Sequence, residues 1–407
     1  MQMTLFDCSD KQRCLLDLFQ AYFNARENKR NTINALAFEK HLESNLFALH
    51  EEIISRKYKP KPSICFIVDK PVKREIFAAD FRDRVVHHFI YNYISPVFEK
   101  HFINDSYSCR VGKGTHYGIQ RIDHFIRSCS WNYSKECYIL KLDIKGYFMA
   151  MNKNLIFEKI ASLLNKEKMK HSFDLPLTLY LIEQTIFNDP TKGCRIKGGM
   201  SDWEGLPPTK SLFHAKSGCG LPIGNLTSQL FANIYLNEFD HFVKRDLKIR
   251  FYGRYVDDFV LVHPDKQYLA SLIPMMKDFL SDKLQLELHP DKIYLQHYSK
   301  GIKYLGVVIK PHRIYIANRT KGNFHQSMKT WNMIIRAKKK LMKEEQDGFL
   351  SSMNSYLGIM KHYRTYKLRK TMLKENLSAY FWNYYYIGKN HVKLERKIKK
   401  IRGCKLH

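Results

Sequence analysis

Two adjacent carboxylates in a predicted hairpin turn are the residues best suited to chemistry in this chain. Asp257 and Asp258 lie between two stretches, 250–255 and 259–263, that are typical of paired β-strands. Like charges this close raise each other's free energy unless a cation neutralises them. A third carboxylate, Asp143, follows directly after another predicted strand and would join them if the strands are neighbours. Because hard carboxylate oxygens favour Mg²⁺ or Mn²⁺, the sequence predicts a site for such ions.

A pair of such ions can activate a hydroxyl nucleophile and stabilise the leaving oxygen in phosphoryl displacement, which is the chemistry of polymerases and nucleases. On its own, an Asp-Asp pair in a turn is ordinarily only a turn. The charge of the chain favours nucleic acid, since 68 Lys and Arg stand against 39 Asp and Glu, a net charge of +29. The 25 Tyr and 26 Phe are interleaved with basic residues, which suits base stacking better than membrane binding.

Composition and termini also restrict the class of protein. With 44% hydrophobic residues the chain can bury real cores, which excludes a disordered basic tail protein. No stretch of about 18 apolar residues is present, and Asp7, Asp10 and Asp17 interrupt the N-terminal segment. We therefore expect neither a membrane span nor a signal peptide, and a cytoplasmic protein. Nine cysteines without a C-x-x-C pair indicate free thiols.

The elements that must position the carboxylates predict an α+β protein. Residues 1–57 have two helical apolar stripes, and a short apolar strand follows at 64–68. Further predicted elements are helices at 80–98, 148–164, 225–244 and 268–280, a strand at 138–142 and a hairpin of 304–309 with 314–316. Residues 165–220 form a mixed segment. From residue 323 onward the chain is predicted to be helical and to form a packed three-helix domain, and residues 331–407 hold 19 Lys and Arg against 5 Asp and Glu.

Three motifs in order resemble those of reverse transcriptases. The hairpin sequence YVDD (255–258) is preceded by LDIKGYF (142–148) and by GLPIGNLTSQ (220–229). The match extends upstream to RVGKGT (110–115) and downstream to KYLGVVI (303–309), the latter similar to a primer grip. The resemblance covers roughly residues 60 to 385. It implies a right-hand polymerase with fingers, a palm built on a small antiparallel sheet and a helical thumb, which copies RNA into DNA with two Mg²⁺ ions.

Within this family the chain most resembles the reverse transcriptases of diversity-generating retroelements, which are bacterial and phage systems. Most relatives have Gln-Gly and Ser-Pro at the ends of the fourth motif, whereas this chain has Ile223-Gly224 and Ser228-Gln229. The segments 201–213 and 355–364 are also similar to characteristic blocks of the subgroup. The resemblance implies misincorporation opposite template adenine. It also implies two partners, a retroelement template RNA and a small basic accessory protein that forms a ring.

The resemblance assigns roles around the carboxylates. Asp143 and Asp257 would coordinate the two metals, Asp258 would complete the acidic cluster, and the backbone carbonyl of Ile144 would add one ligand. Phe148 matches the steric gate, a ring that would clash with a 2′-hydroxyl and so favour dNTP over rNTP.

The resemblance also assigns nucleotide-binding residues. Lys70 and Arg74 would hold the incoming triphosphate through charge-assisted contacts. Lys292 would lie near the pyrophosphate leaving group as electrostatic stabiliser or general acid. Ile223 replaces a glutamine that touches the nucleotide in most relatives, so the nascent base pair would rest on an apolar contact and fidelity would fall. Ile223 and Gln229 are the candidates for that trait.

The template and primer strands complete the predicted site. Contacts to the template strand are expected through Arg110, Lys113 and the backbone between them, and contacts to the primer from the grip-like stretch. The residues expected on these two strands are Arg110, Lys113, Tyr255, Tyr304, Leu305 and Gly306.

The predicted domains are an N-terminal helical extension (1–57), fingers and palm (58–319), a helical thumb (320–390) and a basic C-terminal tail (391–407). No DNA-binding or endonuclease domain is expected after the thumb. Three alternatives share much of this pattern: a retron or group II intron type reverse transcriptase, a defence-associated reverse transcriptase, and a non-catalytic RNA-binding scaffold. The three carboxylates disfavour the scaffold, and Phe148 disfavours an RNA-dependent RNA polymerase.

Overall fold

The structure, a computed structural model, describes residues 5–27, 32–69, 72–167 and 174–397. The chain divides into two compact units, a first unit at Met1–Leu295 and a second unit at Gln296–His407. Both units combine helices and strands, which confirms the predicted α+β class. In the described ranges, no helix is both long enough and apolar enough to cross a membrane. The division into four domains stays a prediction.

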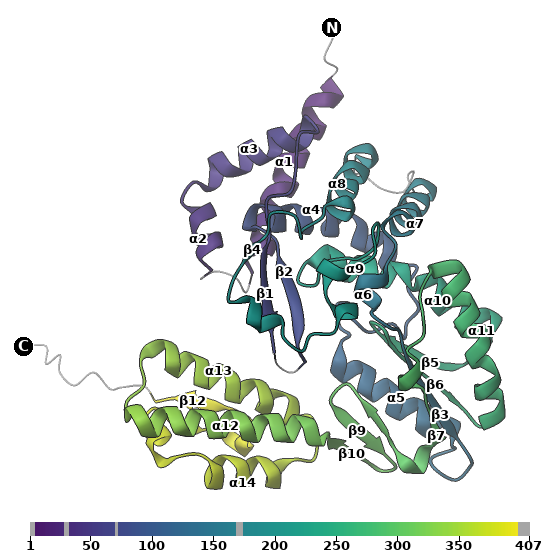
Figure 1. Cartoon of the computed structure of the whole chain (residues 1–407), viewed down its shortest axis with the longest axis vertical. Coiled ribbons are helices and arrows are strands. Elements are labelled where there is room, and N and C mark those ends of the chain that lie inside the picture. The colour runs from purple at the N-terminus through teal and green to yellow at the C-terminus, as the bar shows by residue number, and fades with distance from the viewer. Residues whose placement is uncertain (1–4, 28–31, 70–71, 168–173, 398–407) are drawn as a thin grey trace, which may run out of the picture. The chain divides into compact units, whose positions relative to one another are not determined.

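Helices begin the first unit, as predicted for residues 1–57. They are α1 (Leu5–Arg26), α2 (Ile33–Glu39) and α3 (Leu42–Ile54). Helix α1 packs along α4 (Phe81–Glu99), where the Tyr93 hydroxyl donates to Asp17 at 2.7 Å (Figure 1). Helix α4 begins where predicted because Asp80 caps it, with its side chain accepting from the backbone N–H of Arg82. The N-terminal helices are thereby joined to the main core of the unit.

A four-stranded sheet in the order β5-β6-β3-β7 forms the centre of the chain. Its strands are β3 (Tyr138–Asp143), β5 (Phe251–Tyr255), β6 (Asp258–His263) and β7 (Tyr294–His297). β6 pairs antiparallel with both β3 and β5, which confirms that the two predicted strands at 250–263 form a hairpin beside the strand at 138–142. Helices α5 (Thr115–Cys129) and α11 (Lys266–Leu284) pack against this sheet.

A smaller sheet in the order β2-β1-β4 lies in the same unit. β1 (Ile64–Val68) forms where predicted and pairs antiparallel with β2 (Arg74–Ala78). On its other side β1 pairs parallel with β4 (Arg195–Ile196). In Figure 1, β1 and β2 form a long ribbon beside the segment that carries α6.

The predicted helix at 148–164 is wrong at one point, because the structure divides it into α6 (Tyr147–Ala150) and α7 (Lys153–Lys166). Asn152 is extended, and its side chain caps α7 by accepting from the N–H groups of Asn154 and Leu155 at 2.9 and 3.1 Å. An asparagine that bonds backbone N–H groups in this way ends one helix and begins another. The mixed segment predicted after it contains a helix that the sequence analysis missed, α8 (Leu175–Phe187).

The helix predicted at 225–244 is present as a succession of turns. α9 (Leu226–Tyr235), α10 (Asn237–His241) and a π-helical turn (Phe242–Asp246) follow one another. Their apolar side chains are buried in the main core, as the periodicity predicted. α11 extends beyond its predicted ends at both sides.

Up to residue 397, where the described residues end, the second unit contains a three-stranded sheet and three helices. The strands are β8 (Ile302–Tyr304), β9 (Val307–Lys310) and β10 (Arg313–Ile316), and the helices are α12 (Asn318–Lys338), α13 (Lys343–Met360) and α14 (Tyr366–Asn376). The pairing of β9 with β10 and the three helices confirm two predictions. A single strand at 304–309 is wrong, because a turn at Leu305-Gly306 separates β8 from β9.

The prediction of helix to the end of the chain is also wrong. A hairpin of β11 (Tyr385–Ile387) and β12 (Leu394–Arg396) follows α14. Aromatic residues favour strands, and Tyr385 packs its ring 5.1 Å from that of Phe349 on α13. Tyr385 and Tyr386, predicted to be helical, therefore lie on a strand of the packed second unit.

Candidate active site

The three predicted carboxylates converge at the edge of the central sheet. Asp143, the last residue of β3, is the register partner of Asp258, the first residue of β6. Asp257 lies in the two-residue turn that joins β5 to β6, and its backbone carbonyl accepts from the N–H of Ile144 at 3.3 Å. Two chain segments more than 110 residues apart thus bring the carboxylates together, as the sequence analysis expected.

The turn carrying Asp257 is strained. Val256, its first residue, has φ of +57°, a left-handed conformation that a β-branched residue rarely adopts. Its N–H donates to Ser108 Oγ at 3.3 Å, and its carbonyl accepts from Arg254 Nη1 at 2.9 Å. Such conformations persist only where surrounding contacts fix them, and they cluster at functional sites.

A buried ion pair next to the turn, Arg254–Asp240, supplies the contact to the Val256 carbonyl, and it was not predicted from the sequence. Arg254 and Asp240 both have 0% exposed side chains, and they pair through Nε–Oδ1 and Nη2–Oδ2 bonds of 2.8 and 2.7 Å. The hydroxyl of Tyr252 donates to the same Asp240 carboxylate at 2.6 Å. The available signal was an arginine inside a strand whose other residues are apolar or aromatic, because such a residue is buried only when paired.

The electrostatics of the site favour bound cations or protons. Burial, followed by the charge of Asp143, raises the pKa of Asp257 to about 6. Burial also raises the pKa of Asp258 to about 6, although Lys141 Nζ lies 2.8 Å from its Oδ2. Lys292 Nζ lies 2.6 Å from Asp143 Oδ1. Two lysines therefore offset part of the charge of three carboxylates, and two of these carboxylates still hold protons more tightly than usual.

The donor set fits a hard divalent cation. Oδ1 of Asp258 is buried and has no hydrogen-bond partner in the part of the chain that the structure describes. Ile144 and Leu288 form an isolated β-bridge through two backbone hydrogen bonds. Lys145 N donates to the Glu287 carbonyl, and His289 N donates to the Asp143 carbonyl, so the bridge does not use the carbonyl of Ile144. Carboxylate and carbonyl oxygens are the ligands that Mg²⁺ prefers. Among the described residues, no three His, Cys, Asp or Glu side chains are grouped closely enough to hold an ion by themselves.

Two basic residues predicted to bind the triphosphate have different outcomes. Arg74 is exposed at the start of β2, and its charge counteracts the burial that raises the pKa of Asp257 and of Tyr255. Arg74 therefore lies near the acidic turn. Lys70 lies outside the described residues.

The candidate selectivity residues lie on separate elements. Phe148 on α6 and Ile223, just before α9, are both half-buried and pack against one small apolar cluster, formed by Cys65, Phe77, Met149 and Leu212. The carbonyl of Ile223 accepts from the N–H of Phe77 at 2.9 Å. Gln229 is exposed on α9. The structure thus brings Phe148 and Ile223 onto one support but leaves Gln229 outside that cluster.

The candidate template residues are held by local contacts. Only 6% of the Arg110 side chain is exposed, and its guanidinium bonds Glu99 at 2.8 Å and the carbonyls of Ile103 and Ser106 at 2.7 and 2.9 Å. Lys113 bonds the carbonyl and side chain of Asn104. The Arg110 side chain thus fixes the shape of this loop, and a contact to a nucleic acid would fall to the exposed backbone and Lys113.

The remaining predicted residues lie at strand ends. Tyr255 is half-buried at the end of β5. In the second unit, Tyr304 is buried, and Leu305 and Gly306 form the β8–β9 turn with φ of +44° and +86°. The carbonyl of Gly306 accepts from Ala317 N at 3.0 Å and from Thr320 Oγ1 at 3.2 Å, which ties the turn to the start of α12.

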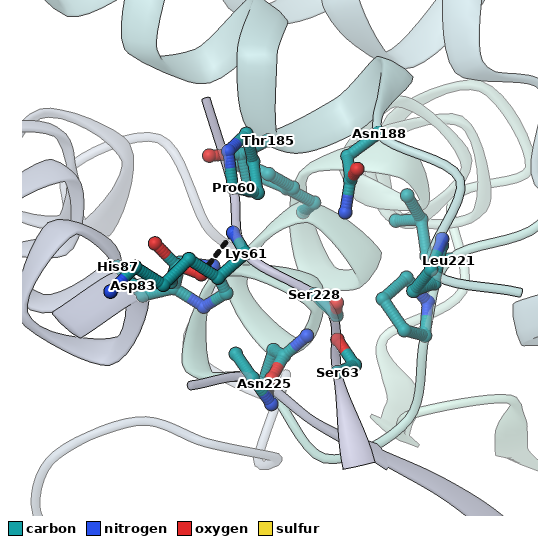
Figure 2. A pocket seen from close by; sticks show the side chains of 14 residues that line it. Pro60, Lys61, Ser63, Asp83, His87, Thr185, Asn188, Leu221, Asn225 and Ser228 are labelled. Atoms are coloured by element: carbon teal, nitrogen blue, oxygen red, sulfur yellow. Dashed lines mark hydrogen bonds between the residues drawn. The ribbon is translucent and has the colours of Figure 1, made fainter. Parts of the chain in front are cut away.

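A polar pocket lies apart from the carboxylates, between α4, α8, α9 and the start of β1 (Figure 2). Its lining includes Lys61, Asp83, His87, Asn225 and Ser228, and none of the three site carboxylates. The N–H of Lys61 donates to Asp83 at 2.7 Å, and burial lowers the pKa of His87 to about 3. The N–H of Ala79 donates to Asn225 Oδ1 at 3.3 Å and Thr227 Oγ1 lies 3.4 Å from His87 Nδ1, so these two contacts tie the segment that carries Ile223 to α4 and to the residue just before its cap.

Known proteins match most of this chain. Residues 60–309 match the family described as "Reverse transcriptase (RNA-dependent DNA polymerase)". "Protein YkfC" of Escherichia coli (strain K12) is 23% identical over 308 residues, which covers 67% of this chain and 73% of that protein. "Nuclear intron maturase 4, mitochondrial" of Arabidopsis thaliana is 28% identical over 161 residues, 39% of this chain and 16% of the maturase.

Solved structures with a similar arrangement include apo telomerase from Candida tropicalis, at 12% identity and a TM-score of 0.46. Telomerase from Candida albicans with a TWJ fragment of telomeric RNA has 13% identity and a TM-score of 0.42. Each similarity covers 81% of this chain and 63% of the telomerase chain, so this chain spans less than two thirds of either. The family match covers more than half of the chain and contains all three converging carboxylates, and this chain therefore belongs to the reverse transcriptase family and carries its RNA-directed DNA polymerase domain.

Proposed function

We propose that this protein is the reverse transcriptase of a diversity-generating retroelement, which copies a template RNA into error-prone DNA for the diversification of a target gene. The observation that best supports polymerase chemistry is the meeting of Asp143, Asp257 and Asp258 at one sheet edge, with a buried Asp258 oxygen that no described group bonds. Support for the retroelement type comes from Ile223, Gln229 and the two blocks at 201–213 and 355–364.

In this proposal Asp143, Asp257 and the Ile144 carbonyl would hold two Mg²⁺ ions, with Mn²⁺ as a substitute, and Asp258 would complete the cluster. Such ions, when bound, would activate the primer 3′-hydroxyl and stabilise the leaving oxygen. Lys292, now 2.6 Å from Asp143, turns to the pyrophosphate and stabilises its charge or donates a proton. Arg74, with Lys70, holds the triphosphate.

Nucleotide choice falls to the residues on the small apolar cluster. Phe148 excludes a 2′-hydroxyl, and Ile223 gives the nascent base pair an apolar contact in place of a polar one. Their common packing against this cluster supports a shared pocket for sugar and base. Gln229, exposed on α9, is the second fidelity candidate.

The wider proposal is a right-hand polymerase with N-terminal helices, fingers and palm, and a thumb formed by α12, α13 and α14. The exposed backbone of the loop that Arg110 fixes, Lys113 and Tyr255 would contact the template side, and Tyr304, Leu305 and Gly306 would contact the primer. Template RNA, dNTPs and a small basic ring-forming accessory protein are the proposed partners, in a bacterial or phage-infected cytoplasm. The similarity to an intron maturase supports one alternative, a group II intron type reverse transcriptase.

The test is DNA synthesis by the purified full chain on a primed RNA template with dNTPs and Mg²⁺, with the products sequenced. A double Asp257→Ala/Asp258→Ala variant should abolish the product, and chelation of Mg²⁺ should do the same. The matched control is Asp278→Ala/Asp282→Ala, which removes two exposed carboxylates from α11.

The outcomes separate the candidate functions. DNA product that is lost only in the turn variant and enriched in errors opposite adenine supports the proposal. Faithful DNA product points to the retron or intron type. No product in the presence of cognate RNA and accessory protein contradicts catalysis and favours the RNA-binding scaffold.

A further inference from the structure

A buried carboxylate on β2 holds a segment that lies 128 to 137 residues further along the chain. Glu75 is 1% exposed, and both of its oxygens are bonded. Oε2 accepts from Trp203 Nε1 at 2.7 Å and from Ser211 Oγ at 2.8 Å, while Oε1 accepts from Leu212 N at 2.6 Å. Bonds to a charged acceptor are stronger than neutral ones, and a carboxylate this buried is tolerated only when such bonds satisfy it.

Glu75 stands beside a residue of the proposed site. Arg74 precedes it on β2, and successive side chains of a strand point to opposite faces. The face of β2 that carries Arg74 is exposed, and the charge of Arg74 counteracts the burial that raises the pKa of Asp257. The face that carries Glu75 is buried under the segment 203–212. The same strand therefore joins the acidic turn to that segment.

The bond to Leu212 N leads directly to the selectivity residues. Leu212 is 8% exposed and belongs to the apolar cluster against which Phe148 and Ile223 both pack. Trp203, a second partner of Glu75, packs against the same cluster. Two of the three donors to Glu75 thus come from residues that touch the support of the proposed sugar gate.

The segment also lies against the turn that leads from Asp143 to Phe148. Gly146 has φ of +57°, and a Cβ at this position would lie 2.9 Å from the carbonyl oxygen of Thr209. Just before β2, Lys73 Nζ donates to the carbonyl of Glu204 at 2.6 Å. The segment is therefore held from both sides, by β2 and by the backbone beneath Phe148.

We propose that Glu75 is a positioning residue for nucleotide selection. By fixing Leu212 and Trp203 it sets the places of Phe148 and Ile223, and thereby the preference for deoxyribonucleotides and the choice of base. The inference rests on the proposed function, because it needs a polymerase whose discrimination can be measured. In this proposal the segment 203–212 holds the apolar cluster against which the sugar gate, Phe148, packs.

Glu75→Gln is the sharpest test. The glutamine amide keeps the volume of the side chain, but its NH₂ group must face at least one of the groups that donate to Glu75. The Ser211 hydroxyl can accept from that NH₂ group instead of donating, whereas the Trp203 N–H can only donate. Steady-state kcat/KM is measured for dGTP and for GTP opposite template cytosine, with the full chain and its RNA. Glu75→Gln should lower the dGTP:GTP ratio by about fivefold to tenfold, the effect of part of one charged hydrogen bond.

Companion variants separate positioning from general damage. Glu204→Gln removes an exposed carboxylate nearby and should leave the ratio within about twofold. Trp203→Phe removes one donor and should lower the ratio less than Glu75→Gln. In the double variant Trp203→Phe/Glu75→Gln the opposed N–H groups are gone, so the ratio should recover part of the loss. Phe148→Ala sets the scale for a lost gate.

Each result decides the inference. A ratio within twofold of wild type in Glu75→Gln, even if both rates fall, overturns it, because a purely structural carboxylate would slow both nucleotides alike. If Glu75→Gln does not fold, Trp203→Phe and Ser211→Ala carry the test, and an unchanged ratio in both overturns it. A wild type that makes no DNA overturns the proposed function together with this inference, whereas DNA synthesis with an unchanged ratio overturns this inference alone.

Discussion

The two carboxylates of the β5–β6 turn differ from ordinary surface aspartates in how firmly they hold protons. In the folded protein the pKa of Asp257 and of Asp258 is about 6, with burial as the largest cause, against about 3.9 for the free side chain. A folded-state pKa above the unfolded one contributes stability that is complete below the unfolded pKa. That contribution is lost as the pH rises through the folded pKa.

We therefore expect an Asp257→Asn/Asp258→Asn variant to gain stability over wild type as the pH rises from about 4 to about 7. The gain should be a few kcal/mol in the free energy of unfolding, because two groups shift by about two units each. The measurement is urea unfolding of both proteins across this range in a chelator, with Asp278→Asn/Asp282→Asn as control. Saturating Mg²⁺ should reverse the difference by stabilising wild type alone. A difference that does not change with pH contradicts the raised pKa values.

At the level of elements, the β5–β6 hairpin, which carries the acidic turn, depends on the buried pair Arg254–Asp240. Removing one partner of a buried ion pair leaves an uncompensated charge, which costs about 3–5 kcal/mol. Arg254→Met should lower the free energy of unfolding by this amount. It should also release the Val256 carbonyl, which accepts from Arg254 Nη1 at 2.9 Å in the wild type. Arg254→Met/Asp240→Leu, which removes both charges, should recover much of the stability but not the polymerase activity, since the turn has lost its tether.

The matched control for this prediction is Lys192→Met. Lys192 Nζ lies 3.9 Å from Asp189, and 85% and 41% of the two side chains are exposed, so the loss of this pair should cost about 1 kcal/mol or less. Urea unfolding and primer extension on the three variants check the prediction. Equal losses in Arg254→Met and Lys192→Met, or full activity in the double variant, would show that the buried pair does not position the turn.

Elements whose residues carry one strong local signal were predictable from the sequence. The strands at 138–142 and 259–263 are short apolar runs, and their pairing brings Asp143 opposite Asp258 as expected. The break at Asn152 was missed because a single capping residue outweighs an apolar pattern that continues across it. Glu75 was missed for another reason, since a glutamate in a strand is expected at the surface and its three partners lie 128 to 137 residues away.

At the scale of the whole molecule, charge is the property that the sequence predicted most directly, and residues 331–407 carry nearly half of it. Residues 331–407 hold 19 basic against 5 acidic residues in a chain of net charge +29. On α12, Lys329, Arg336 and Lys340, just after its end, are exposed. A protein that neutralises phosphates releases counterions, so the logarithm of its affinity falls linearly with the logarithm of salt concentration.

We expect the variant Lys329→Gln/Arg336→Gln/Lys340→Gln to bind a primed RNA–DNA duplex with a salt slope smaller by about 1 to 3, since each lost phosphate contact removes about 0.7–0.9. The matched control, Lys266→Gln/Lys277→Gln/Lys283→Gln, removes three exposed lysines from α11, which packs on the central sheet. Its slope should stay close to that of wild type. The measurement is fluorescence anisotropy of labelled duplex between about 50 and 200 mM salt. Equal reductions in both variants would mean that net charge alone attracts the nucleic acid, and that the helices after residue 318 do not clasp the duplex as a thumb does.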